Sequence, residues 1–219
     1  MTPPPGRREQ RKAETRQAIS DVATGLIIAR GFEAVSMSEI ARAAGVSRKT
    51  VFNYFASKED LVFDRDEEAR ALLREGMLAR RSMPPLAAFQ SLVQELLESG
   101  HPLLRINTGA AAFWLTVAES PVLAGRAREL QALLIADLAC LMADATGADP
   151  ADAPAQLGAS MLIAALVVAY ADALRAFNKG NDSTPAFTAT WQRGSIGVHA
   201  ALSGTAYTAR HQQPARNDH

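Results

Sequence analysis

The chain has 219 residues, of which 48% are hydrophobic, and its 23 Lys and Arg balance its 23 Asp and Glu. This length and hydrophobic content are enough for a full core without a stabilising metal or disulfide. Cys140 is the single cysteine, which excludes an intramolecular disulfide and a cysteine-rich zinc site and favours a reducing cytoplasm. Because Leu138, Leu141 and Met142 are its neighbours in the sequence, we expect Cys140 to be a small core residue.

The charge is not uniform along the chain, although the net charge is zero. Residues 1–58 contain ten Lys and Arg against five Asp and Glu, whereas residues 59–219 contain 13 against 18. A local excess of basic residues is typical of proteins that bind the phosphates of nucleic acid. The distribution therefore predicts that the first part of the chain, and not the acidic remainder, faces nucleic acid.

The first ten residues are expected to form a flexible basic arm, because they are rich in proline and polar residues and contain no hydrophobic segment of a secretory signal. Apolar residues spaced by three and four then predict a helix over residues 11–30, which Gly31 ends. The apolar face of this helix is expected to pack against the elements that follow. It carries Ala18, Ile19, Val22, Leu26 and Ala29.

Two short helices are predicted over residues 36–55. Ser36 and Glu39 have the spacing of a capping box, in which each side chain accepts the free backbone N–H of the other residue. Gly45 can take the left-handed conformation that ends a helix, and Ser47 can cap the next one. A turn over residues 44–47 between two capped helices is typical of a helix-turn-helix motif.

The second of these helices has a packed side and a free side. Successive residues of a helix are rotated by about 100° around its axis, which places Val51 and Phe55 on one side and Lys49 and Asn53 on the opposite side. The free side offers donors that bind base edges and phosphates in a major groove, from Arg48, Lys49, Thr50 and Asn53. The alternative is the solvated face of an ordinary helical protein, but the paired caps and the glycine turn favour a recognition helix.

The rest of the chain predicts further helices and no strands. Ser57, with Asp60 in the capping-box position, begins a long helix that continues to about residue 81 and connects two domains. Prolines at first helical positions predict the later helices, near residues 86–99, 103–118, 121–146, 151–178 and 185–203. The sequence thus predicts an all-α protein of about nine helices, with a three-helix DNA-binding domain (11–57), a linker helix and larger helical domain (58–204) and a flexible tail (205–219).

The last two helices carry more apolar surface than one core needs. The apolar run from Leu157 to Ala171 has 15 residues, short of the roughly 20 that span a bilayer, so we expect a buried helix and no membrane segment. In the last helix, one stripe contains Trp191, Ser195, Val198 and Leu202, and another contains the small residues Gly194, Gly197, Ala201 and Gly204. We therefore expect close helix packing and a homodimer formed through these two helices.

Residues 32–61, F-E-A-V-S-M-S-E-I-A-R-A-A-G-V-S-R-K-T-V-F-N-Y-F-A-S-K-E-D-L, resemble the DNA-binding signature of the TetR family of bacterial transcriptional regulators. The resemblance implies that Arg48 and Lys49 contact bases and that Phe52 lacks a hydroxyl that many members use on phosphate. It implies phosphate or groove-edge contacts for Met37, Ser38, Thr50, Tyr54 and Lys58. The arm residues Arg7, Arg8, Arg11 and Lys12 either reach a minor groove or stay unbound.

The resemblance also implies how such a protein works. A cytoplasmic homodimer would place its recognition helices in successive major grooves of a palindromic operator, about 34 Å apart. A small apolar or aromatic ligand in the second domain would release a repressor from that operator, because it binds another spacing of the dimer better. No metal or other cofactor is implied.

Two alternatives remain open at this point. The chain can be a DNA-binding regulator without an inducer, or an activator, because Phe89, Phe113 and Trp114 suit plain core as well as an apolar pocket. An enzyme is disfavoured, because His101, His199 and two histidines in the tail form no HExxH motif, and the chain has neither a glycine-rich phosphate loop nor GxSxG. No catalytic residue is therefore predicted.

Overall fold

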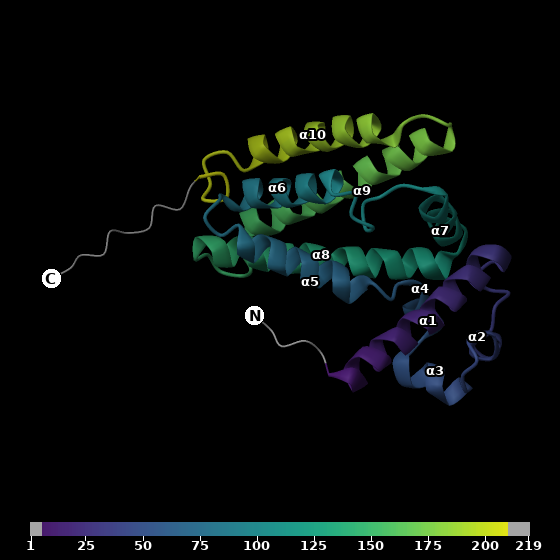
Figure 1. Ribbon diagram of the computed structural model, residues 1–219. Helices are drawn as coiled ribbons and strands as arrows, with labels where there is room; N and C mark the ends of the chain where they lie inside the picture. The colour runs from purple at the N-terminus through teal and green to yellow at the C-terminus, as the bar shows by residue number, and fades with distance from the viewer. Residues whose placement is uncertain (1–5, 210–219) are drawn as a thin grey trace. The chain divides into compact units, whose positions relative to one another are not determined.

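The computed structural model describes residues 6–209, with the backbone alone for Arg7 and Glu9, and this part contains helices and turns but no strand (Figure 1). The all-α prediction is confirmed, with ten helices in place of about nine. Their bounds are α1 Arg7–Arg30, α2 Met37–Ala43, α3 Arg48–Tyr54, α4 Lys58–Val62, α5 Asp66–Ala79, α6 Pro85–Glu98, α7 Thr108–Glu119, α8 Pro121–Thr146, α9 Ala153–Asn178 and α10 Ser183–Ala201.

The described chain divides into two compact units. Unit 1 consists of the residues up to Glu67 together with Gly109–Glu129, and unit 2 consists of Glu68–Thr108 and the residues from Leu130 onward. Helix α8 contributes its first nine residues to unit 1 and the others to unit 2. The domain boundaries expected from the sequence stay a prediction, because a compact unit is not by itself a domain that folds alone.

Unit 1 is organised around an apolar cluster to which α1 to α4, α7 and the start of α8 contribute. The apolar side of α1 and the inner sides of α2 and α3 pack together, because each short helix has only one apolar stripe to bury. Ile40, Ala41, Val51 and Phe55, expected to pack on α1, are all at most 3% exposed. The other members are Ile19, Ala23, Ile27, Phe32, Val35, Leu61, Val62, Val117 and Leu123.

The long helix predicted from residue 57 to residue 81 is wrong. Helix α4 ends at Val62, residues 63–65 form a turn, and α5 begins at Asp66. The backbone of Phe63 leaves the helical region (φ −106°, ψ 42°), and its ring packs edge to face on Phe113 with centroids 5.8 Å apart. The Asp64 side chain in this turn is half-buried, and burial raises the pKa of its carboxyl. The contact of Phe63 thus holds the turn within unit 1 and interrupts the helix.

Most other helix bounds agree with the prediction within two residues, with two exceptions. Helix α1 begins at Arg7, so residues 7–10 of the expected arm are helical, and residues 1–5 lie outside the described part of the chain. Helix α7 begins at Thr108 in place of residue 103, because residues 102–104 form a turn in which His101 Nδ1 accepts the N–H of Leu103 at 3.3 Å.

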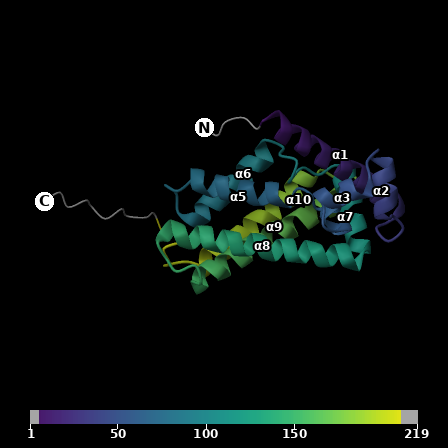
Figure 2. The same cartoon turned by 90° about the horizontal axis from the view of Figure 1, so that it is seen from below.

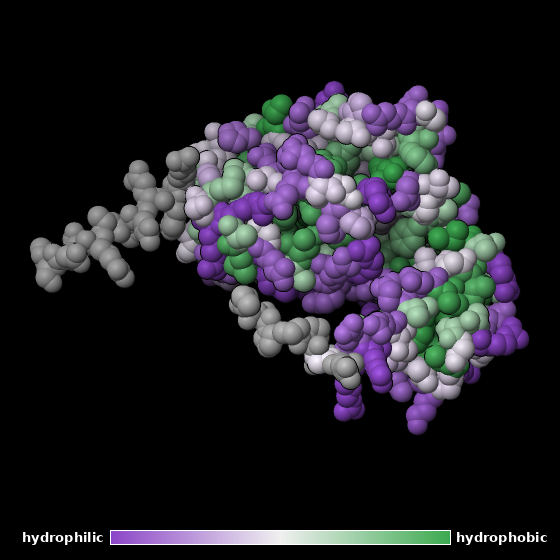
Figure 3. Space-filling view, in the orientation of Figure 1, coloured by the Kyte–Doolittle hydropathy of each residue, from purple (hydrophilic) through white to green (hydrophobic). Residues whose placement is uncertain are grey.

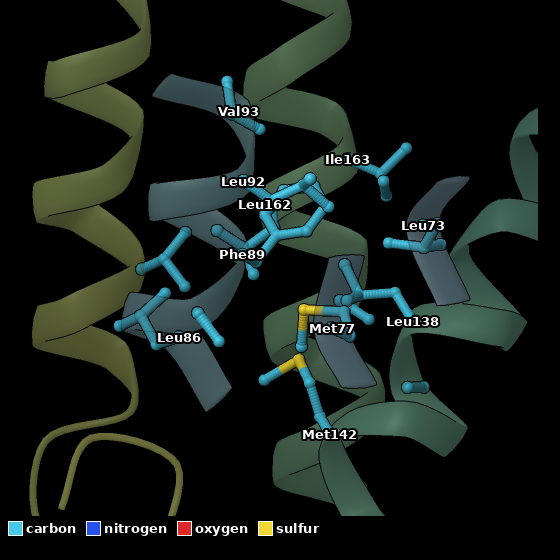
Figure 4. Packing of buried hydrophobic residues seen from close by; sticks show 14 of the residues in the cluster. Leu73, Met77, Leu86, Phe89, Leu92, Val93, Leu138, Met142, Leu162 and Ile163 are labelled. Atoms are coloured by element: carbon cyan, nitrogen blue, oxygen red, sulfur yellow. The ribbon is translucent and has the colours of Figure 1, made fainter. Parts of the chain in front are cut away.

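Unit 2 is a bundle of α5, α6, α9, α10 and most of α8. In its core Phe89 meets Trp191 with centroids 6.1 Å apart, and Met77 and Met142 point toward each other (Figure 4). Cys140 is exposed, so its expected place in the core is wrong. Leu138 and Met142 are each two residues from Cys140, about 200° around the helix, and both are fully buried on the opposite side of α8.

Helices α9 and α10 lie side by side (Figures 1 and 2) and approach closely where small residues face each other. A Cβ built on Gly194 would lie 2.5 Å from the Cβ of Ala165, and one on Gly158 would lie 2.7 Å from Leu202 Cδ1. The expected close approach is confirmed at Gly194. Within one protomer, a Cβ on Gly197 would meet nothing within 4 Å, so close approach at Gly197 stays a prediction.

Helix α9 is long and apolar enough to cross a membrane by length and composition, although a third of that stretch is buried inside the protein. Its buried residues include Ala159, Leu162, Ala169 and Ala173, which lie in the core of unit 2. A core helix of a soluble protein meets the same criteria, so this finding is weak evidence for a membrane segment.

The loose tail predicted from residue 205 is wrong for residues 205–209. Tyr207 is 3% exposed, its hydroxyl donates to Asp152 Oδ2 at 2.7 Å, and its carbonyl accepts the N–H of Leu86 at 3.2 Å. The chain is therefore fixed against the starts of α6 and α9 as far as this tyrosine. Residues 210–219 lie outside the described part.

The close approach of α9 and α10 can be tested with two matched substitutions in α10. Gly194→Ala is expected to unfold more easily than Gly197→Ala by about 1 to 3 kcal/mol, because both gain the same helix propensity but only the first overpacks against Ala165. Urea unfolding at one fixed protein concentration measures the difference, since association would add to the stability. Equal stability of the two variants would contradict the packing described here.

Candidate nucleic-acid interface

Helix α2 begins with the predicted capping box. Ser36 Oγ accepts the N–H of Glu39 at 3.2 Å, and Glu39 Oε2 accepts the N–H of Ser36 at 3.0 Å. Arg30 of α1 also pairs with Glu39 at 3.1 Å. These contacts, with the Ser36 N–H as the largest cause, lower the pKa of Glu39 to about 2. The carboxylate that caps α2 therefore stays charged at neutral pH.

The turn between α2 and α3 has the predicted form. Gly45 has φ 68°, a left-handed conformation that is strained for residues with a side chain. Ser47 Oγ then accepts the N–H of Thr50 at 3.0 Å, and α3 begins at Arg48. The chain thus passes from α2 to α3 through a turn of four residues, as the helix-turn-helix prediction required.

Helix α3 is anchored to α1 by its inner side. Val51 and Phe55 are at most 1% exposed, and the guanidinium of Arg16 lies 4.2 Å from the centroid of the Phe55 ring. The same guanidinium donates to the carbonyl of Tyr54 at 2.7 Å. Sequence reasoning missed Arg16, because its partners lie 38 and more residues away and no local spacing reveals them.

The outer side of α3 carries four exposed residues: Arg48, Lys49, Phe52 and Asn53. The guanidinium of Arg48 lies 5.4 Å from the centroid of the Phe52 ring, one helical turn along. Thr50 and Tyr54 are half-buried at the edge of this side, and the Thr50 hydroxyl is 2.7 Å from that of Ser47. The helix thus presents two cations, an amide and an aromatic ring together.

The remaining predicted contact residues lie at the two neighbouring helices. Ser38 is exposed on α2, while Met37 is half-buried against the core of unit 1. The ammonium of Lys58 donates to the carbonyls of Phe32 at 2.6 Å and Val35 at 3.0 Å and lies 3.9 Å from the centroid of the Phe32 ring. Two of its three donors thus hold the α1–α2 loop, and its predicted phosphate contact stays a prediction.

The three aromatic residues considered for a ligand pocket do not form one within either unit. Phe89 lies in the core of unit 2, whereas Phe113 and Trp114 meet edge to face in unit 1, 5.3 Å apart. A cavity of about 30 Å³ in unit 2 lies between Met77, Met83 and Leu141, enough for about one water molecule. Within residues 6–209, no three His, Cys, Asp or Glu side chains form a group that can hold a metal ion.

Comparison with known proteins connects this geometry to a family. Residues 19–64 match the model of the bacterial regulatory proteins of the tetR family. The regulator AcrR of Shigella flexneri is 34% identical over 94 residues, which cover 42% of this chain and 44% of AcrR. The repressor KstR2 of Rhodococcus jostii is 28% identical over 153 residues, which cover 58% of this chain and 75% of KstR2.

A solved structure extends the likeness to the whole fold. NalD, the secondary repressor of the MexAB-OprM multidrug efflux pump in Pseudomonas aeruginosa, is 20% identical, with a TM-score of 0.56 over 86% of this chain and 97% of NalD. In three curated relatives the aligned stretch covers only 25 to 44% of the relative's own length. The matched residues include α2, its glycine turn and α3, so the helix-turn-helix part of this chain is similar to the tetR family of bacterial regulatory proteins.

Proposed function

We propose that this protein is a homodimeric, sequence-specific DNA-binding regulator of transcription in the cytoplasm. The family consists of transcriptional regulators, and the chain is not an enzyme. The observation that carries the proposal is the outer side of α3, where Arg48, Lys49 and Asn53 are exposed on a helix whose inner side is fully buried. Such a helix can enter a major groove without losing its own packing.

The side chains of α2 and α3 would divide the contacts with DNA. Arg48 and Lys49 lie on the first turn of α3, where base edges are reached, and both cations match guanine acceptors. Thr50, Asn53 and Tyr54 flank them and suit phosphates or further bases, while Met37 and Ser38 would touch the groove edge.

The dimer would form through α9 and α10. One protomer leaves large apolar side chains exposed on these adjacent helices, namely Leu157 (50%), Val167 (47%), Val168 (52%) and Ile196 (71%), and hydrophobic residues reach the surface in the region of α10 (Figure 3). Apolar surface on neighbouring helices marks an interaction site, and a two-fold interface would cover it with its own copy. The operator would then be palindromic, with half-sites about 34 Å apart.

Repression is the mode of action that the relatives favour, because KstR2 and NalD are both described as repressors. A small apolar or aromatic ligand would release the protein from DNA. The cavity of about 30 Å³ between Met77, Met83 and Leu141 is too small for such a ligand, which would bind at another place or to another conformation. The second candidate is a regulator controlled without a small-molecule inducer.

The assignment of Lys49 can be tested on a duplex selected by the protein from random DNA. Lys49→Ala is expected to weaken binding by about 1 to 3 kcal/mol and to relax the preference at one base position, because the ammonium contacts a base edge. Fluorescence anisotropy with single-position variants of the duplex measures both effects. Lys179→Ala, which removes an exposed charge next to α9, serves as the control. Full affinity and specificity of Lys49→Ala would contradict the assignment.

Lys58 has two roles that one variant can separate. Loss of its bonds to the Phe32 and Val35 carbonyls in Lys58→Ala is expected to lower the free energy of unfolding by about 1 to 3 kcal/mol. Loss of a phosphate contact would instead weaken binding to all duplexes alike and flatten the dependence on salt. Urea unfolding and a salt titration of binding measure the two roles. An unchanged unfolding curve would rule out the structural role.

The dimer interface can be tested at Ile196. Ile196→Glu is expected to give a folded monomer, because two copies of the charge would meet near a two-fold axis without partners. Sedimentation velocity measures the mass, and binding to the selected duplex is expected to weaken at least tenfold. Leu115→Glu, at another exposed apolar position, in α7, is the control and should remain a dimer. A dimeric Ile196→Glu variant would place the interface elsewhere.

A further inference from the structure

Phe52 is an aromatic residue on the outer side of α3, and its side chain is 45% exposed. Single exposed apolar residues are common on protein surfaces and need no explanation. The neighbours of Phe52 are unusual, however, because Arg48, Lys49 and Asn53 around it are all exposed polar residues of the side proposed to face DNA. The ring is therefore part of that surface.

Arg48 and Phe52 act as a pair in the free protein. They are four residues apart, so they lie above one another on the helix, and the guanidinium is 5.4 Å from the ring centroid. A cation above an aromatic face is attracted by the ring electrons. The pair forms one column along α3, while Lys49 and Asn53 form the next column, about 100° away. The position of the Arg48 side chain is thus restricted before any DNA binds.

The chemistry of the ring limits what it can contact. A phenyl group has no donor or acceptor, so it cannot bind a phosphate oxygen or a polar base edge. In the major groove, the apolar group that distinguishes one base from another is the C5 methyl of thymine, which phenylalanine contacts well. Guanine offers the paired O6 and N7 acceptors that suit an arginine fork.

Resting on the proposed function, we propose that Phe52 determines sequence specificity by contacting the methyl group of a thymine. Arg48, held by the Phe52 ring, binds a guanine within one or two base pairs of that thymine. The column of Arg48 and Phe52 therefore recognises a thymine and a guanine together, and Lys49 and Asn53 contact other positions of the half-site.

The test uses the full-length protein and the duplex that it selects from random DNA. Each thymine of a half-site is replaced in turn by deoxyuridine, which removes the methyl group and leaves base pairing unchanged. One replacement is expected to weaken binding about fourfold, the value that corresponds to one buried methyl group. Replacement of a nearby guanine by 7-deazaguanine removes N7 and is expected to weaken binding further.

Variants of Phe52 assign the effect to the ring. Phe52→Ala is expected to bind the thymine and deoxyuridine duplexes equally, whereas Phe52→Tyr keeps the ring and should keep the fourfold difference. Leu115→Ala removes another exposed apolar side chain of unit 1 and should also keep it. Arg48→Lys retains the charge but loses the planar fork, so it should lose the preference for guanine over 7-deazaguanine. Circular dichroism confirms that each variant is folded.

Three results would overturn the inference. All deoxyuridine duplexes could bind the wild-type protein as well as the thymine duplex. The difference could persist in Phe52→Ala. Phe52→Ala could also weaken binding to every duplex equally, as expected if the ring packs on a sugar. If the proposed function itself is wrong, the result differs, because no sequence is then enriched from random DNA. The inference about Phe52 would then fail together with the proposed function.

Discussion

Val51 and Phe55 are buried on the inner side of α3, with Arg16 of α1 above the Phe55 ring and bonded to the carbonyl of Tyr54. This anchorage fixes the rotation of α3 about its axis. Because the helix cannot turn, Lys49 and Asn53 face outward whether or not DNA is present. A fixed reading side avoids an entropic cost on binding, which is the benefit of preorganisation. The proposed recognition of DNA by the exposed cations of α3 depends on this buried side.

The rest of unit 1 supports the same arrangement through bonds to the backbone. The ammonium of Lys58 joins the start of α4 to the loop that leads into α2, and Glu39 caps α2 while it pairs with Arg30 of α1. Each of these charged groups already forms hydrogen bonds or an ion pair within the protein. Basic residues of this unit therefore divide into those that build the fold and those that remain exposed, and the net charge of a segment does not separate the two groups.

Caps, turns and helix faces could be predicted from the sequence, because Ser36, Gly45 and Ser47 act on residues three or four positions away. Contacts between distant segments could not. Phe63 ends α4 partly through its contact with Phe113, fifty residues later, and Tyr207 is fixed by Asp152 and Leu86. Cys140 has apolar neighbours but lies on the side of α8 away from the core. The likeness of residues 32–61 to a known signature identified the candidate site, but the occupied donors of Lys58 depend on three-dimensional contacts that no motif records.

The central claim is that two copies of this chain recognise DNA through α3 with two-fold symmetry. Selection of duplexes from a random pool by the purified protein, followed by sequencing, tests this claim most directly. The account predicts enrichment of one inverted repeat whose half-sites are centred about one helical turn, or a multiple of it, apart. Enrichment of an unrepeated motif would contradict the two-fold arrangement, and the absence of any enriched sequence would contradict recognition by α3.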